Sequence, residues 1–208
     1  MRTFVLGLGV ALVGCQCKEA TKPAPKAVSA PAELSYAATA PIEGALAYPF
    51  TQADSKLTWV GQKITGKHEG AFGIFGGIIE LVDGNAEKSR VRAEIDMSSL
   101  QSEPEKLVGH LKGPDFFSVQ EFPRATFVST SIAKSGEAYS VTGNLTMHGV
   151  TRAITFPATI GISAAEVTVN AEFAINRKDF GIVYPGKPDD LIADDVALKL
   201  EIHAKKRS

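Results

Sequence analysis

Cysteine is scarce in this sequence of 208 residues, which contains only Cys15 and Cys17. Everything after Cys17 must therefore fold without disulfide bonds or buried thiols, which is plausible for a chain of this size. An excess of charge is also missing, because 22 lysines and arginines stand against 23 aspartates and glutamates, for a net charge of −1. This balance removes the electrostatic basis for a nucleic-acid partner.

A membrane-spanning helix is not encoded at the N-terminus, because such a helix requires roughly 20 apolar residues. The apolar run of residues 4–13 is shorter, follows a basic start and leads into Leu-Val-Gly-Cys15. This pattern resembles a signal peptide that ends in a lipobox. We therefore expect a signal peptide of residues 1–14, cleavage before Cys15 and a lipid anchor on its sulfur. An ordinary secretory signal is the alternative.

The same segment predicts where the mature protein resides. Export with a lipid anchor places it at the periplasmic face of a bacterial cell envelope. Gln16 is not an aspartate, which by resemblance to enterobacterial sorting favours the outer membrane. Cys17 can stay free, pair with another chain or carry a second lipid, and a homodimer stays among the expected assemblies.

Residues 15–48 are expected to form a flexible linker. Alanine, proline, lysine, serine and threonine dominate the segment, and no hydrophobic period is visible. Such a chain buries too little apolar surface to offset its ordering entropy, and thirty residues of it span roughly 30 Å. The expected folded domain is residues 49–208, which is long enough for a real core.

Alternation of apolar and polar residues predicts an all-β domain. Around residue 93, for example, Val91, Ala93 and Ile95 share one face, and charged residues occupy the other. Long strands with one apolar face, and without helices to cover them, favour closure into an antiparallel up-and-down barrel, which leaves no free edge. We expect eight strands, over residues 56–64, 73–82, 89–97, 124–134, 139–147, 154–162, 167–175 and 196–202.

One short helix is predicted in the long loop of residues 98–123. Ser102-Glu103-Pro104-Glu105 has the spacing of a capping box with proline in the first turn, and Gly113-Pro114 ends the element. Turn sequences such as Asp83-Gly84 and His148-Gly149 separate the strands.

Alternate connections of an up-and-down barrel lie at the same end, which predicts an elaborate mouth and a plain floor. The mouth receives the two longest connections, residues 98–123 and 176–193, together with the loops around residues 68 and 148. Its candidate polar ligands are His68, His110, His148, Arg177 and Tyr184.

Inward-facing apolar side chains are candidate ligand contacts, and ordinary core packing is the alternative for each of them. Glycines crowd residues 66–77, which predicts a corner of the sheet or room for a ligand. Large and small residues mix along the inner faces, which fits either an interdigitated core or a narrow channel. The candidate lining residues are Trp59, Phe72, Phe75, Ile95, Phe127, Val141, Leu145, Phe156, Phe173, Leu198 and Leu200.

Four motifs resemble the YceI-like, polyisoprenoid-binding family: HLKGPDFF from His110, FPRATF from Phe122, VTGNLTMHGVT from Val141 and NRKDFG from Asn176. In order and spacing they cover essentially the whole domain. The resemblance implies a lipocalin-like eight-stranded barrel that encloses a long isoprenoid lipid, such as a quinone or polyprenyl lipid, with its headgroup at the mouth. It implies carriage or storage, no catalytic activity and no cofactor besides the bound lipid. Members are often plain periplasmic proteins, whereas this chain carries a lipidation signal.

Two alternatives stay open. The rim histidines, with Asp115 or Asp179 beside them, form a candidate zinc site, although they lack the local spacing of dedicated zinc motifs. A packed barrel that serves only as an envelope scaffold or interaction module is the second. Catalysis is not expected, because the sequence contains no Gly-x-Ser-x-Gly elbow, no nucleophile with a nearby base and no phosphate-binding loop.

Overall fold

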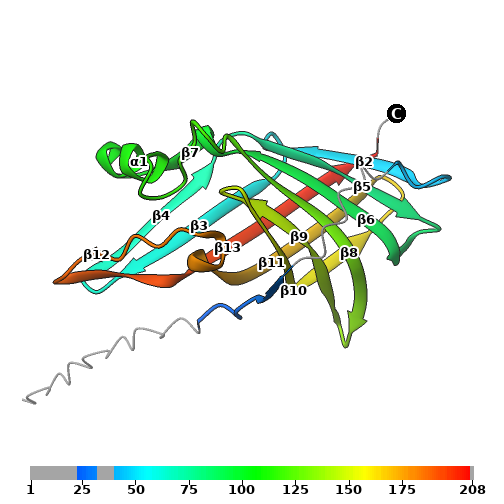
Figure 1. Ribbon diagram of the computed structural model, residues 1–208. Helices are drawn as coiled ribbons and strands as arrows, with labels where there is room; N and C mark the ends of the chain where they lie inside the picture. The colour runs from blue at the N-terminus through cyan, green and yellow to red at the C-terminus, as the bar shows by residue number, and fades with distance from the viewer. Residues whose placement is uncertain (1–22, 32–39, 207–208) are drawn as a thin grey trace, which may run out of the picture.

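The computed structural model describes residues 23–31 and 40–206. Within these ranges the chain forms a curled, barrel-like antiparallel sheet with one α-helix at one end (Figure 1). The predicted signal peptide and both cysteines lie outside the described residues. In the described part, no helix has the length and apolar character needed to cross a membrane.

Three barrel strands are bent, and each consists of two segments. They are β2 (Leu46–Thr51) with β3 (Lys56–Lys63), β4 (Gly66–Phe72) with β5 (Phe75–Val82), and β6 (Asn85–Asp96) with β7 (Leu100–Ser102). Pairing continues on both sides of the bends, since β2 pairs with β5 and β5 with β6, while β3 pairs with β4 and β4 with β7. The three bends therefore form one corner of the sheet.

Five further strands complete the barrel: β8 (Arg124–Ser135), β9 (Ala138–Met147), β10 (Val150–Ile162), β11 (Glu166–Asn176) and β13 (Asp190–Lys205). Each pairs antiparallel with its neighbour, and β13 pairs with β3, so the pairing returns to its start. When each bent strand is counted once, the barrel has eight strands, as predicted, and three of them are divided into two segments. The predicted strands did not include β2, of which residues 46–48 fall in the predicted linker, or β4, whose exposed and glycine positions hide the period.

The corner explains the glycine-rich stretch. The Gly73 amide donates to Ser99 O at 3.0 Å, and the Ile74 amide donates to Ser99 Oγ at 2.9 Å, in the 3₁₀ helix η1 (Met97–Ser99). A Cβ at Gly70 would lie 2.5 Å from Trp59 Cε2, and one at Gly77 would lie 2.5 Å from Phe50 Cζ. The space over these two glycines is thus filled by rings of the chain itself and is not left for a ligand.

The N-terminal segment corrects the prediction of an unstructured linker. β10 and β11 pair only over residues 159–162 of β10 and then separate. Strand β1 (Val28–Pro31) pairs with β10 in the resulting gap, while Ala27 N donates to Ala174 O of β11 at 2.6 Å. The gap leaves backbone N–H and C=O groups of β10 and β11 without strand partners, and β1 supplies partners for them. This explains why a proline-rich segment with no apolar period of its own is ordered.

The predicted helix is present, but its start differs. Helix α1 (Glu105–Lys112) has Pro104 as N-cap with no side-chain hydrogen bond, and Gly113 follows its last turn as expected. The predicted capping box is wrong because Ser102 belongs to β7, where its hydroxyl donates to Glu69 O at 2.7 Å. The hairpin turns at Asp83-Gly84 and His148-Gly149 both have positive φ at each residue, as type I′ turns require.

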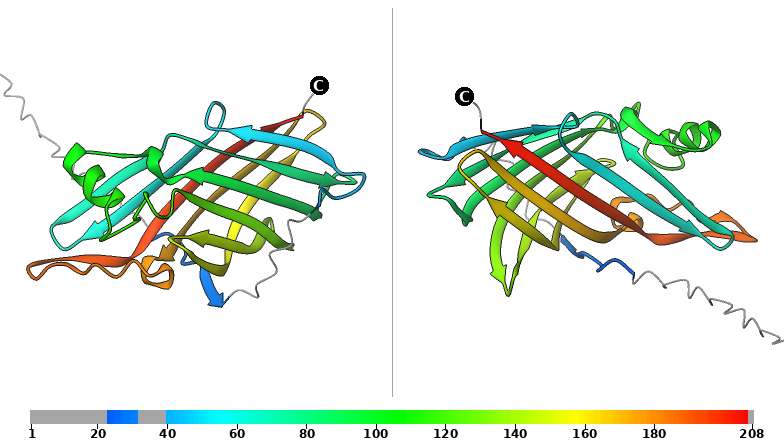
Figure 2. Two further views of the ribbon diagram at one scale, coloured as in Figure 1. Left: turned by 45° about the horizontal axis from the view of Figure 1, so that its top comes forward. Right: turned by 180° about the vertical axis from the view of Figure 1, so that it is seen from behind.

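The long connections gather at one end, which we call the mouth. Figure 2 shows α1 and the hairpin of β12 (Gly186–Lys187) with β13 at that end, and the C-terminal end of β13 at the other, which we call the floor. The 3₁₀ helix η2 (Arg177–Phe180) also follows β11 toward the mouth. Short turns alone connect the strands at the floor, as predicted.

Candidate functional site

The mouth half of the barrel is hollow. It contains a cavity of about 340 Å³, which falls within the range of ligand pockets in proteins. Its wall is mainly apolar and is built from alternate residues of several strands, together with α1 and the loops of the mouth. Strand residues at its inner end include Leu57, Ala125, Leu145, Ile175 and Leu198.

The structure divides the predicted lining residues into two groups. Trp59, Phe72, Ile95, Leu145 and Leu198 lie in the cavity wall. The remaining six do not line the cavity; they are Phe75, Val141, Phe156 and Phe173 of the buried core, and Phe127 and Leu200, which are partly buried against it. Alternation along a strand shows which side chains point inward, but it does not show whether the interior at that level is hollow.

Aromatic rings fill the barrel beyond the cavity. Phe156 and Phe173 are stacked, with ring centroids 4.2 Å apart and planes 11° apart. Phe127 packs against Phe156 at 5.7 Å. The Phe127 ring covers Gly143, where a Cβ would lie 2.4 Å from Phe127 Cζ. These rings therefore pack against one another beyond the cavity.

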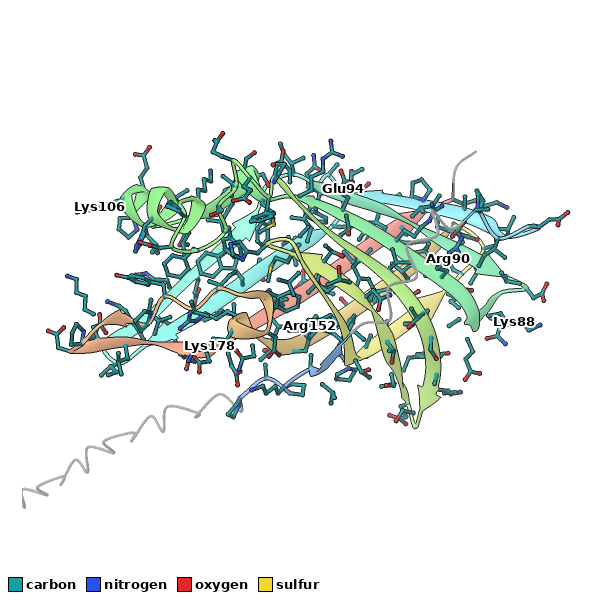
Figure 3. All side chains as sticks on the ribbon, viewed as in Figure 1. Lys88, Arg90, Glu94, Lys106, Arg152 and Lys178 are labelled. Carbon is teal, nitrogen blue, oxygen red and sulfur yellow. The ribbon has the colours of Figure 1, made fainter. Side chains whose placement is uncertain are left out.

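Helix α1 and the loop after it form one side of the mouth and were missed as site elements. Leu107 and Leu111 of the helix line the cavity, and so do Phe116 and Phe117 of the loop. The helical spacing of Leu107 and Leu111 is the sequence signal that could have identified this apolar face. Figure 3 shows Lys106 on α1 and Lys178 on η2 at this same end of the molecule.

An aromatic cluster joins the two sides of the mouth. The His110 ring packs edge-on against Phe116 at 5.0 Å and against Tyr184 at 5.1 Å. His110 Nε2 lies 3.0 Å from a carboxylate oxygen of Asp115, which orients the imidazole. His110 and Tyr184 therefore connect α1 to the loop before β12 while both line the cavity.

His68 enters the mouth from a strand and not from the predicted loop. It lies on β4 directly opposite Gly61 of β3, which gives the imidazole room. Near it, Lys63 Nζ donates to Asp190 Oδ2 at 2.5 Å, and the Thr65 amide donates to Asp190 Oδ1 at 3.1 Å. The pKa of the Asp190 carboxyl is lowered, chiefly by the hydrogen bond from Lys63. These contacts attach the β3–β4 turn to the β12–β13 hairpin.

Arg177 has a structural task that the sequence did not reveal. Its side chain is buried, and it donates from Nη1 to Ile182 O at 2.7 Å and from Nε to Ala193 O at 3.1 Å. Nη2 lies 3.3 Å from a carboxylate oxygen of Asp194. Burial lowers the pKa of the guanidinium and the charge of Asp194 opposes this, but an arginine keeps its charge at neutral pH. Arg177 lines the cavity but uses most of its donors to hold the loop between η2 and β13.

His148 is the one predicted mouth residue that does not line the cavity. It occupies a left-handed turn position with φ 51°, and its Nδ1 lies 3.0 Å from Phe180 O. Its ring packs against Phe122 at 4.9 Å. His148 thus attaches the β9–β10 turn to η2.

The predicted zinc site is not formed by the described residues. Among the residues that the structure describes, no three His, Cys, Asp or Glu side chains lie close enough together to hold a metal ion. His110 has one carboxylate, Asp115, beside it, and His148 contacts a backbone carbonyl. Asp179 contributes its own backbone carbonyl to Arg152.

Trp59 lies in the cavity wall and has an indole N–H without a hydrogen-bond partner among the described residues. It is the single tryptophan of the chain, and its Nε1 is buried without a hydrogen-bond partner within the described part of the structure. Because this nitrogen is itself covered, it offers no donor to a molecule in the cavity.

Comparison with known proteins identifies the family. A model of the YceI-like domain matches residues 48–204. The chain belongs to the YceI-like family. A UPF0312 protein of Pseudomonas putida strain GB-1 is 33% identical to this YceI-like chain over 153 residues, which are 70% of this chain and 78% of the relative.

Solved structures share the fold. The crystal structure of Burkholderia cenocepacia BcnA superposes with a TM-score of 0.66 at 29% identity, over 74% of this chain and 98% of BcnA. A polyisoprenoid binding domain from Saccharophagus degradans superposes with a TM-score of 0.64 at 19% identity, over 78% of this chain and 99% of that domain. This YceI-like chain thus has the predicted all-β, barrel-like fold.

Proposed function

We propose that this protein binds an isoprenoid lipid, of the quinone or polyprenyl type, and carries or stores it in the bacterial envelope. The observation that carries the proposal is the apolar cavity at the mouth end of the barrel. The polyisoprenoid-binding domain with the same fold supports the choice of ligand. Binding, and not catalysis, is the activity proposed.

The headgroup accounts for selectivity in this proposal. Burying a methylene from water stabilises by about 0.8 kcal/mol. An isoprenoid tail that leaves a bilayer, however, exchanges one apolar environment for another, so its burial contributes little to net transfer. Shape and polar contacts must decide, and His68 and Tyr184 offer polar groups in the wall.

The tether belongs to the same proposal. A lipid on Cys15 would keep the domain close to the membrane that supplies the ligand, which raises the local concentration without any new contact. Replacing Cys15 with serine should release the protein from membranes and abolish labelling by a fatty-acid analogue. Retained labelling would contradict the assignment of the anchor.

The central experiment identifies what the full chain binds in a bacterial host. The protein is purified from membranes, the detergent is exchanged, and the bound lipids are extracted and identified by mass spectrometry. A matched control is Gly61→Leu, because a Cβ at Gly61 meets only Trp59 at 3.6 Å while a longer side chain would occupy the cavity. We expect an isoprenoid lipid at about one per protein in the wild type and its loss in the variant.

Trp59 provides an independent readout, because it is the single tryptophan and lies in the cavity wall. Addition of a quinone with an isoprenoid tail should quench its fluorescence in the wild type and not in Gly61→Leu. If no isoprenoid co-purifies and no quenching occurs, the proposed function is wrong.

A further inference from the structure

One segment of the barrel wall is attached by few backbone contacts. β1 occupies the gap in which β10 and β11 separate, and its four residues pair with β10. Toward β11, Ala27 N donates to Ala174 O at 2.6 Å, and Ala174 N donates to Pro25 O at 2.8 Å. We call residues 25–31, which are blue in Figure 1, the strap. The strap is a short segment in a wall of long strands.

Few side chains hold the strap in place. Within the part of the strap whose side chains the structure describes, Ala27 alone is buried, and Val28 is 70% exposed. Lys26 Nζ lies 2.7 Å from Asp195 Oδ1, but both side chains are exposed, and such ion pairs contribute little stability. Segments with few buried apolar contacts open locally at low free-energy cost, and the lids of binding sites are drawn from them.

The gap beneath the strap is a slot whose two ends are fixed. Toward the floor, residues 159–162 of β10 pair with β11. Toward the mouth, Arg152 of β10 donates from Nε to Asp179 O of η2 at 2.9 Å. Between these ends, residues 153–158 of β10 extend over about 20 Å. Displacement of the strap would therefore open the wall at this place while both ends of the slot stay joined.

The slot faces the apolar interior of the barrel. Phe156 of β10 and Phe173 of β11 are buried, and their rings stack with centroids 4.2 Å apart. Ile175 lies two residues after Phe173, on the same face of β11, and it lines the cavity. The slot thus leads to the cavity once the strap is displaced and the two strands that carry the rings move apart.

The mouth is fastened more firmly than the slot. Buried Arg177 donates to two carbonyls of the loop between η2 and β13. Asp190 accepts from Lys63, and the His110 ring packs on Tyr184. A long tail that entered end-on through the mouth would also expose its apolar surface to water on the way, which is unfavourable.

We infer that the strap is displaceable and that a long isoprenoid tail enters the barrel sideways, through the slot that opens between β10 and β11. The inference rests on the proposed function and specifies how its ligand is loaded. The strap controls the rate of entry and is not itself a contact of the bound ligand.

The test locks the strap with a reversible cross-link. Ala30 of β1 and Ala153 of β10 are register partners. Residues directly opposite each other on antiparallel strands have Cα atoms about 4.5–5.5 Å apart, which a disulfide can bridge. The strap pair is Ala30→Cys with Ala153→Cys. It is made in the full chain with Cys15→Ser and Cys17→Ser, which remove the only other thiols.

A second pair controls for the cross-link itself. Glu172→Cys with Lys199→Cys joins exposed register partners of β11 and β13, whose pairing is continuous along β11. Loading is followed as the rate of Trp59 quenching after mixing with detergent micelles that contain a long-chain ubiquinone. A further variant, Ala27→Asp, weakens the strap because it places a charge at its buried position.

We expect the oxidised strap pair to load more slowly than the same protein after reduction, by about tenfold or more, which corresponds to about 1.4 kcal/mol of added barrier. The control pair should load at one rate in both redox states. Ala27→Asp should load faster than its parent, because a weaker strap opens more often.

The outcomes separate the inference from the proposed function. Equal rates in the oxidised and reduced strap pair, equal slowing in the control pair, or an unchanged rate in Ala27→Asp would overturn the inference, while the quenching itself would support the proposed function. Failure of the strap pair to form a disulfide, measured by mass spectrometry, would also overturn it, because the strap would then not lie against β10. If no protein is quenched and no isoprenoid co-purifies with the wild type, the proposed function fails and the inference fails with it.

Discussion

Replacement of Arg177 by lysine separates a structural role for this residue from a ligand-binding role. The guanidinium is 4% exposed and donates to Ile182 O and Ala193 O, which lie on opposite sides of the β12–β13 hairpin. An ammonium cannot reach both carbonyls in the geometry of a planar fork. Hydrogen bonds to charged groups contribute about 1.5–3 kcal/mol each. We therefore expect Arg177→Lys to lower the free energy of unfolding by about 3 kcal/mol.

Urea unfolding and thermal scans measure this loss. For a chain of this size, about 3 kcal/mol corresponds to a fall in Tm of about 6–12 °C. Lys178→Met is the matched control, because Lys178 is a neighbour that also contacts Asp194, at 2.9 Å, but in an exposed pair. An exposed pair contributes less than about 1 kcal/mol, so this variant should unfold close to the wild type. The reasoning is refuted if Arg177→Lys keeps wild-type stability and loses only lipid binding, because Arg177 would then be a headgroup ligand.

Three further variants test the fold. Burial alone would raise the pKa of Glu80, but hydrogen bonds from Arg90 and a backbone amide outweigh this effect, and the pKa is lowered. Ionised Glu80 therefore stabilises the fold at a pH above its ordinary pKa of about 4.3. This contribution is lost as the pH falls through the lower folded-state pKa. In urea unfolding, the stability difference between wild type and Glu80→Gln should therefore shrink as the pH is lowered from 6 toward 3, and a constant difference would contradict the pKa assignment. Removal of residues 1–31 should expose the gap between β10 and β11, so we expect a lower Tm and increased binding of an apolar dye; an unchanged Tm would show that β1 contributes nothing. Gly143→Ala should lower the free energy of unfolding by about 1–3 kcal/mol or more, because its Cβ would meet the Phe127 ring. Gly66→Ala should leave the free energy of unfolding nearly unchanged in the same denaturation assay, because its Cβ would meet nothing within 4 Å.

Local sequence patterns predicted the strands and the two unequal ends of the barrel. Alternation fixes which side chains point inward, and turns such as Asp83-Gly84 and His148-Gly149 fix where strands reverse. The alternation of connections in an up-and-down barrel then placed His68, His110, Arg177 and Tyr184 at the mouth, although His68 lies on β4 and not in a loop.

Long-range packing explains what the sequence did not reveal. Phe127, Phe156 and Phe173 have the same local pattern as the residues of the cavity wall, and only the structure shows that their rings pack on one another. The role of Arg177 depends on the carbonyls of Ile182 and Ala193, and the loop between η2 and β13 must fold back before the second of these, sixteen residues away, comes within reach. The pairing of β1 depends on a gap between two strands more than a hundred residues away.

The division of the barrel into a solid half and a hollow half follows from the energetics of the fold. Space without packed side chains forgoes the dispersion contacts that stabilise a core. Stacked rings supply such contacts beyond the cavity. The hollow mouth is then held by contacts between its loops: the aromatic cluster around His110, the Lys63–Asp190 ion pair and the Arg177 hydrogen bonds.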